Sequence, residues 1–200
     1  MERKIILIAI LTLSVCLLPS FIPYDEIGEE PGEHLSSQNA PWEIDMDHSS
    51  IGFMIKHLGI AKIHGFFRHF EGRVMSDQDD LVNGSINFTI DVNSLDSFNG
   101  PRDTHLKSTD FFNVKEYPEI AFTSKSFKRA KGGTYRLTGD LAIKDITKEV
   151  TFEVIKTGEV TVAGIRKAAY EATATINRFD YNLNWNPLTP EHVPVVDQYV

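Results

Sequence analysis

Apolar and polar residues alternate along much of the chain. From residue 85 to residue 92 the alternation is unbroken, with Ile86, Phe88, Ile90 and Val92 separated by polar residues. A period of two is typical of a strand with one buried face and one solvated face. The pattern returns at residues 135–143, 150–154 and 170–176. A chain with so many one-sided strands must close their apolar faces around a common interior.

The expected strands lie between residues 42 and 177. Turn residues separate them, most clearly Gly132-Gly133, which predicts a tight hairpin. The best candidate helix is short, at residues 104–108, after the breaker Asn99-Gly100-Pro101. The expected strands are residues 42–45, 50–56, 61–70, 72–75, 84–91, 120–128, 134–143, 147–156 and 167–177. Many short strands with one or two short helices predict an all-β antiparallel barrel or sandwich.

The first 22 residues have the pattern of a signal peptide or membrane anchor. Arg3 and Lys4 precede an apolar run at residues 5–15, and further apolar residues reach position 22. The uncharged stretch 5–22 is close to the minimum length for spanning a bilayer, so membrane association through it stays an alternative. Cys16 stands where a lipoprotein cysteine could stand, although Val15 is large for the position before one. Each alternative predicts an exported protein, periplasmic or otherwise extracytoplasmic.

Composition then restricts the rest of the chain. Residues 23–40 are rich in Pro, Gly, Glu and Ser and predict a flexible acidic linker, which leaves residues 41–200 as one domain. Cys16 is the only cysteine, so this domain must fold by packing alone, without disulfides or a Cys-ligated zinc. The net charge of −8 argues against a nucleic-acid partner, because no basic stripe is present to neutralise phosphates.

The densest polar cluster is Arg102, Asp103 and His105. These side chains could grip a phosphate or form an acid–base pair, which would make the protein a hydrolase-like enzyme. The structural alternative, which we favour, is that Arg102 and Asp103 tie a loop to the barrel while Phe111 and Phe112 plug one end. No nucleophile accompanies the cluster, so no catalytic residue is assigned and no enzyme is expected.

Four histidines lie close together in the sequence and raise the question of a metal site. Their spacings are all odd, so neighbours on one uninterrupted strand would face opposite sides. No metal site is therefore expected from these residues: His48, His57, His64 and His69.

The aromatic content leaves two interiors open. Phenylalanine alone occurs 13 times, which suits either a filled core or a tunnel lined by rings and branched aliphatic residues for a long apolar ligand. Small residues such as Gly139, Ala142, Ala172 and Ala174 would leave space if they point inward, which favours a cavity.

Several motifs, in order, resemble one known family. The opening has Trp42-x-Ile44-Asp45-x-x-His48-Ser49, and the middle has Arg102-Asp103-x-His105-Leu106 followed by Asp110-Phe111-Phe112. The end has Gly139-Asp140-Leu141-x-Ile143 and Asn177-Arg178-x-Asp180-Tyr181. Together they are similar to the YceI-like, polyisoprenoid-binding family. The resemblance implies an elongated, lipocalin-like antiparallel barrel whose pore takes a long isoprenoid chain, such as a quinone tail or polyprenyl lipid, in an exported protein without established catalytic residues.

Two departures from the family pattern carry expectations of their own. The turn at residues 144–147 lacks the usual Gly, and Asp145 is the residue expected to tolerate positive φ there. The family's closing strand would follow residues 196–200, so an unpaired barrel edge is expected, which would favour a homodimer.

The resulting hypothesis is a lipid-binding module for transport, storage or sequestration outside the cytoplasm. No cofactor is expected other than a bound polyisoprenoid or quinone-like lipid. A hydrolase-like enzyme and a solid-core structural or stress-related module stay as alternatives. The residues predicted to line the lipid site are Ile51, Phe53, Ile55, Ile86, Phe88, Ile90, Phe122, Leu137, Leu141, Phe152, Tyr170 and Ile176.

Overall fold

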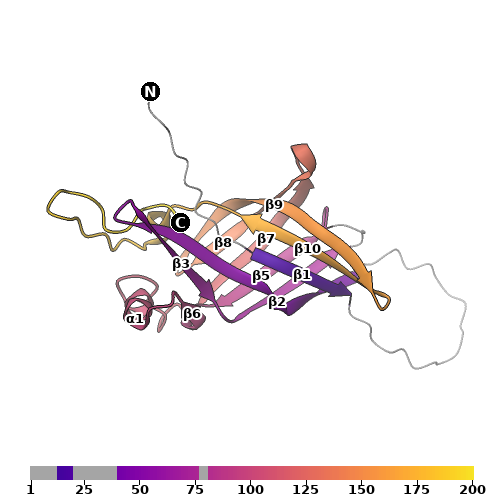
Figure 1. The fold of residues 1–200 in the computed structure, drawn as a ribbon, viewed down its shortest axis with the longest axis horizontal. Helices are drawn as coiled ribbons and strands as arrows, with labels where there is room; N and C mark the ends of the chain where they lie inside the picture. The colour runs from indigo at the N-terminus through magenta and orange to yellow at the C-terminus, as the bar shows by residue number, and fades with distance from the viewer. Residues whose placement is uncertain (1–12, 20–39, 77–80) are drawn as a thin grey trace, which may run out of the picture.

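The computed structural model describes residues 13–19, 40–76 and 81–200. Nearly all of its regular structure is strand, as the alternation predicts, with a single α-helix among these residues. The strands are β1 (Leu13–Pro19), β2 (Ala40–His57), β3 (Ala61–Phe67), β4 (Phe70–Ser76), β5 (Ser85–Asp91), β6 (Leu95–Asp96), β7 (Glu119–Arg129), β8 (Tyr135–Ile143), β9 (Ile146–Val162) and β10 (Ile165–Thr173), and the helix is α1 (Gly100–Lys107). Figure 1 shows an elongated body formed by one strongly curled sheet.

All strand pairings are antiparallel. The order is β1-β10-β9-β8-β7-β5-β4-β2-β3-β6, and an additional pairing joins β1 to β2. The ladder of hydrogen bonds therefore returns on itself and closes a barrel, which confirms the predicted fold class. Figure 1 places α1, the β2–β3 turn and the C-terminal segment at one end of this barrel.

The seam between β10 and β2 is closed by two segments of chain. At the α1 end, residues 195–200 run between them: Leu58 donates to Val195 O, and Ile176 and Val200 exchange two backbone hydrogen bonds. Farther along, β1 pairs with Ala168–Ala172 on one side and with residues 42–51 on the other. This position is thus occupied, which differs from the expected unpaired edge.

The expected leader and linker overlap only partly with the described residues. Residues 1–12, 20–22 and 23–39 lie outside them, whereas 13–19 form β1 and Ala40 begins β2. A leader at 1–22 and a linker at 23–40 stay predictions. In the described part of the chain, no helix has both the length and the hydropathy needed to span a bilayer.

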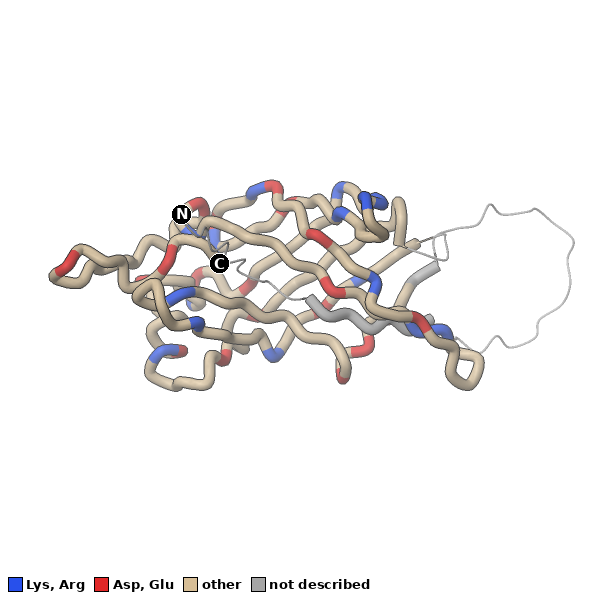
Figure 2. The backbone as a smooth tube through the Cα atoms, turned by 45° about the horizontal axis from the view of Figure 1, so that its top comes forward, with Lys and Arg blue, Asp and Glu red and all other residues tan. Residues whose placement is uncertain are grey.

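The outer surface carries mixed charge. Figure 2 shows Lys and Arg scattered among Asp and Glu along the barrel, without a basic stripe. One acidic side chain, Asp45 on β2, is nevertheless buried; it lies 2.9 Å from His48 Nδ1 and 3.4 Å from Lys167 Nζ on β10. The hydrogen bond from His48, and then that from Lys167, lowers the pKa of Asp45. This ion pair joins the strands on either side of the seam.

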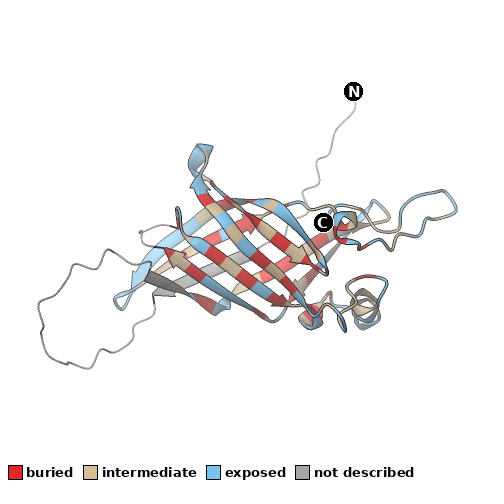
Figure 3. Ribbon diagram, turned by 180° about the vertical axis from the view of Figure 1, so that it is seen from behind, coloured by how far each residue is buried: buried red, intermediate tan, exposed pale blue. Residues whose placement is uncertain are grey.

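Burial follows the predicted period of two. On β5 the even positions Ile86, Phe88 and Ile90 are buried, and on β8 Tyr135, Leu137, Leu141 and Ile143 are buried. Figure 3 shows the resulting alternation of buried and exposed positions across the sheet. The face assignments that follow from parity are therefore confirmed for these strands.

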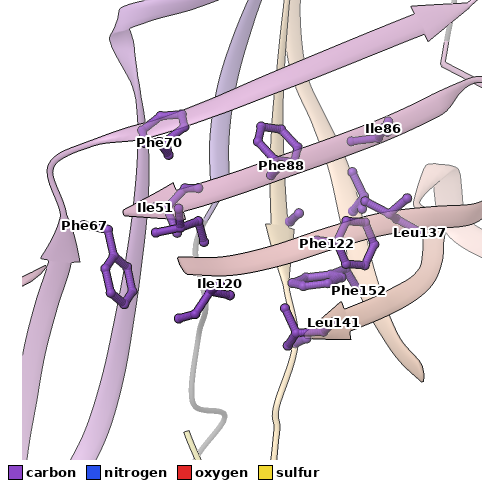
Figure 4. Packing of buried hydrophobic residues seen from close by; sticks show 14 of the residues in the cluster. Ile51, Phe67, Phe70, Ile86, Phe88, Ile120, Phe122, Leu137, Leu141 and Phe152 are labelled. Carbon is purple, nitrogen blue, oxygen red and sulfur yellow. The ribbon is translucent and has the colours of Figure 1, made fainter. Parts of the chain in front are cut away.

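The half of the barrel away from α1 is filled by aromatic rings. Phe127 stacks on Tyr135 with ring centroids 5.1 Å apart, and Tyr170 meets both rings edge-on. Nearer the middle, Phe122 and Phe152 meet at 5.3 Å in an edge-to-face pair, which Figure 4 shows beside Phe88. Offset and edge-to-face pairs of this kind are the favoured aromatic geometries.

Of three local predictions, one hairpin turn is confirmed, whereas one turn residue and the bounds of the helix differ in the structure. Gly132 and Gly133 have φ of +72° and +79°, which confirms the hairpin turn. In the β8–β9 turn the positive φ of +57° falls on Lys144, so the assignment to Asp145 is wrong. The predicted helix at 104–108 instead spans Gly100–Lys107, because Pro101 occupies its first turn and Asn99 caps it.

Candidate functional site

A cavity of about 440 Å³ opens in the α1 half of the barrel. Inward residues of β2, β3, β5, β7 and β8 form its wall, while α1, the loop that follows it and the C-terminal segment cover its end. Its volume lies in the range of small-molecule sites, about 300–1,000 Å³. The lining residues are Phe53, Ile55, Lys56, His57, Ile63, Phe67, Ile90, Pro101, Arg102, His105, Leu106, Phe111, Phe112, Ile120, Leu141, Ile143, Ile176, Arg178, Leu183, Trp185, Val195, Val196 and Val200.

The lining is apolar apart from five side chains. Lys56, His57, Arg102, His105 and Arg178 are the exceptions, and none of the lining residues is Asp or Glu. Although the whole chain has a net charge of −8, the polar side chains that border the cavity are therefore all basic residues. An apolar interior with a few basic groups at its border suits an amphiphile whose tail is buried and whose polar head stays near the surface.

Arg102 is positioned by the start of α1. Asn99 accepts a hydrogen bond from the Arg102 backbone N–H at 3.0 Å, and this cap fixes the helix on the rim of the barrel. The Arg102 guanidinium donates to Ser97 Oγ at 2.8 Å and to the Ser97 carbonyl. Asp103 accepts from the backbone N–H and the hydroxyl of the same buried serine. Both side chains thus pin the β6–α1 connection, as in the structural interpretation of the cluster, and Arg102 also borders the cavity.

His105 forms the outer rim. Its Nε2 lies 2.9 Å from Asp110 Oδ2, and its ring meets Trp185 and Phe111 edge-on at 4.7 and 5.1 Å. His105 is 37% exposed and Asp110 is 52% exposed, so this part of the cavity reaches solvent. Phe111 and Phe112 both line the cavity at the same end, where the sequence placed a plug.

Arg178 is the most deeply buried cation of the site. It is 2% exposed and donates to the backbone carbonyls of Leu183, Val196 and Asp197. Burial lowers the pKa of its guanidinium, although arginine stays charged. Leu183 follows the 3₁₀ turn that begins at Arg178, and Val196 and Asp197 belong to the C-terminal segment. Arg178 therefore holds these two segments together as one wall of the cavity.

Tyr181 follows Arg178 in a short 3₁₀ turn (Arg178–Tyr181) and is also 2% exposed. Its hydroxyl has no hydrogen-bond partner among the described residues. Burial, with a smaller contribution from Asp180, raises the pKa of Tyr181 to about 12. The hydroxyl therefore stays neutral and packs as part of the core.

The predicted lipid-lining residues divide into two groups. Five of them border the cavity: Phe53, Ile55, Ile90, Leu141 and Ile176. The other seven are buried in the packed core instead: Ile51, Ile86, Phe88, Phe122, Leu137, Phe152 and Tyr170. Parity identifies inward residues, but it does not say at which depth the barrel interior is open.

Sequence reasoning missed several lining residues. Arg178, Trp185, Val195 and Val196 come from irregular chain after β10, where no strand period marks an inward face. Arg178 stands inside a family motif, but a charged residue gives no signal of burial. For Ile63, the parity of β3 was an available signal.

The four histidines lie apart. His48 contacts Asp45, His57 borders the cavity, His64 pairs with Met54 in the β2–β3 register, and His69 lies 3.9 Å from Asp91. Within residues 13–19, 40–76 and 81–200, no group of three or more His, Cys, Asp or Glu is placed to hold a metal ion.

Comparison with known proteins decides the family. A model of the YceI-like domain matches residues 42–200. The chain belongs to the YceI-like family. It is 38% identical over 151 residues to UPF0312 protein plu2095 of Photorhabdus laumondii and 36% identical over 152 residues to Protein YceI of Escherichia coli; each match covers 74% of this chain and 78% of the relative.

Two solved structures share the fold of this chain. BcnA of Burkholderia cenocepacia matches with a TM-score of 0.65 and 25% identity, over 78% of this chain and 94% of that one. The YCEI protein of Campylobacter jejuni matches with a TM-score of 0.57 and 29% identity, over 69% and 81%. These matches confirm the family resemblance that the sequence motifs indicated.

Proposed function

We propose that this protein binds a lipid with an isoprenoid or similar apolar tail in the cavity beneath α1, and that it carries, stores or sequesters this lipid outside the cytoplasm. The observation that carries the proposal is the apolar cavity, which the side chains of an otherwise filled barrel leave open. Burial of about ten CH₂ groups contributes roughly 8 kcal/mol before the entropic cost of association, which is enough for binding without a covalent link.

The polar groups of the site support an amphiphilic ligand. Lys56, Arg102 and His105 border the cavity, and the exposure of His105 marks the side on which a polar head would meet solvent. A tail can then lie among Ile90, Ile120 and Ile143, where it meets no unpaired polar group of the strands.

A binding role fits the polar cluster better than catalysis does. Arg102 and Asp103 are both hydrogen-bonded to Ser97, and the cavity lining contains no Ser, Thr or Cys that could act as a nucleophile. The extracytoplasmic location rests on the leader pattern of residues 1–22. The ligand is the only non-protein component we propose.

A matched pair of variants tests the proposal. Ile63 borders the cavity, whereas Ile60, in the neighbouring turn, is 87% exposed. Ile63→Trp should fill part of the cavity and weaken binding of a fluorescent prenyl probe by about tenfold or more, equivalent to ~1.4 kcal/mol. Ile60→Trp should bind like the unmodified protein. Equal binding by both variants, or no uptake of the probe by the unmodified protein, would contradict the proposal.

A further inference from the structure

The cavity ends abruptly at one row of the sheet. Ile90 on β5 faces Ile120 on β7, which faces Ile143 on β8, and all three border the cavity. One inward position deeper, Phe88 faces Phe122. Both rings are buried and lie outside the lining of the open space, whereas Leu141, which faces Phe122 on β8, still borders it. The cavity therefore ends within this row, and the rings of Phe88 and Phe122 close the interior directly behind its lining. We call these two rings the floor.

A third ring supports this floor from below. Phe152 on β9 lies 5.3 Å from Phe122 in an edge-to-face contact at 84°. Figure 4 shows the rings of Phe88, Phe122 and Phe152 gathered across the interior. Beneath them lie the stacked pair Phe127–Tyr135 and the ring of Tyr170. These rings lie in the path of a tail that extends past the floor.

The two floor rings pack against glycines, whose missing side chains leave room for them. A Cβ atom at Gly139 would lie 2.6 Å from Phe122 Cζ, and one at Gly72 would lie 2.6 Å from the Phe88 ring. Both distances are shorter than carbon atoms can approach, so each ring occupies the space that a side chain would need. The rings of Phe88 and Phe122 are thus packed directly against the backbone of the neighbouring strands. The sequence suggested that Gly139 would leave open space, but the Phe122 ring fills that space.

We infer that Phe88, Phe122 and Phe152 set the longest apolar tail that the protein encloses, an inference that rests on the proposed lipid-binding function. At roughly 30 Å³ for a group the size of a water molecule, a cavity of about 440 Å³ holds on the order of fifteen such groups. The favoured ligand is therefore an amphiphile with a tail the size of a farnesyl group. The additional carbon atoms of longer prenyl chains stay outside the barrel and add little affinity.

A homologous series of prenyl alcohols tests this floor. Geraniol, farnesol, geranylgeraniol and solanesol would compete with a fluorescent fatty-acid probe for the full-length protein. The affinity should rise from geraniol to farnesol and then level off. In Phe122→Ala the rise should continue to geranylgeraniol, with a gain over the unmodified protein of about tenfold or more.

Phe127 offers a matched control. Like Phe122 it is buried in the aromatic core, but it lies below the floor and away from the cavity. Phe127→Ala removes a ring of the same size and should leave the length profile unchanged. Because Phe→Ala in a core is strongly destabilising, the milder pair Phe122→Leu and Phe127→Leu decides the question where either alanine variant fails to fold.

The outcomes separate the two proposals. If the affinity of the folded Phe122 variants still levels off at farnesol, the inference that the floor limits tail length is wrong, while lipid binding stands. The same follows if the affinity of the unmodified protein rises without a break from farnesol to solanesol. Failure of both the probe and every alcohol to bind would contradict lipid binding itself, and the floor with it.

Discussion

One side chain of the site, Arg178, both borders the cavity and stabilises the fold. Arg178 faces the cavity, but its guanidinium donates to three backbone carbonyls, those of residues 183, 196 and 197. A buried guanidinium that donates to several carbonyls satisfies groups that would otherwise lose their hydrogen bonds with water. Arg178 is thus the residue that attaches the C-terminal segment to the barrel.

Replacement of Arg178 should therefore act on stability first. Arg178→Met preserves bulk but leaves the three carbonyls without their donor, and we expect the free energy of unfolding to fall by about 3 kcal/mol. Urea denaturation measures this loss. Tyr181→Phe in the same turn is the control, because it removes only an unpaired buried hydroxyl and should not destabilise. An Arg178→Met variant as stable as this control would contradict the assigned role.

Asp45 gives the molecule an acid-sensitive contact across the seam. Its pKa is lowered from 3.8, chiefly by the hydrogen bond from His48 and then by that from Lys167. Because the folded-state pKa is below the unfolded-state value, the stabilisation is present above pH 3.8 and is lost as the pH falls through the lowered pKa. Urea midpoints measured on both sides of this range should fall less in Asp45→Asn than in the unmodified protein. Identical acid dependence in the two proteins would show that this contact contributes nothing.

Among the strands, β1 has a special position. It bridges β10 and β2 through backbone pairing on both sides, and it belongs to the segment whose sequence has the leader pattern. Cleavage of such a leader would leave the edges of β2 and β10 without this partner. The closing contacts of residues 195–200 at the α1 end do not depend on β1.

Removal of residues 1–22 tests the role of β1. The backbone amides of Ala168–Ala172 should exchange with deuterium about tenfold faster or more, corresponding to ~1.4 kcal/mol of lost protection. The amides of the β7–β8 pair serve as the internal control and should keep their protection. Unchanged exchange of β10 after removal would mean that β1 does not close the barrel.

The elements show where sequence information was sufficient. Strict alternation located β5 and β8 closely, because a strand with one buried face requires it. The pattern failed where two signals compete. Asn99-Gly100-Pro101 suggested a breaker, yet Asn at the cap and Pro in the first turn are also the signals that start a helix. Residues 46–49 separated two expected strands, but β2 runs through them without interruption.

Considered as a whole, the barrel combines a solid half with an open half. The sequence predicted a barrel and its inward residues, but it suggested an unpaired edge and did not locate the boundary between these halves. That boundary depends on how the Phe122 ring lies over Gly139 and meets Phe152, contacts that join β7, β8 and β9. Single-chain periodicity contains no information on such packing. The sequence did not predict the residues that cover the cavity either, because Trp185 and Val195 lie in irregular chain without a period of apolar residues.

The most direct test of the account is a crystal structure of the full-length protein after loading with farnesol. We expect a continuous apolar chain between the rim at His105 and the floor at Phe122, in contact with Ile90, Ile120 and Ile143. A cavity closed by side chains after loading, or farnesol bound only on the outer surface, would contradict the claim that the open half of this barrel is a lipid site.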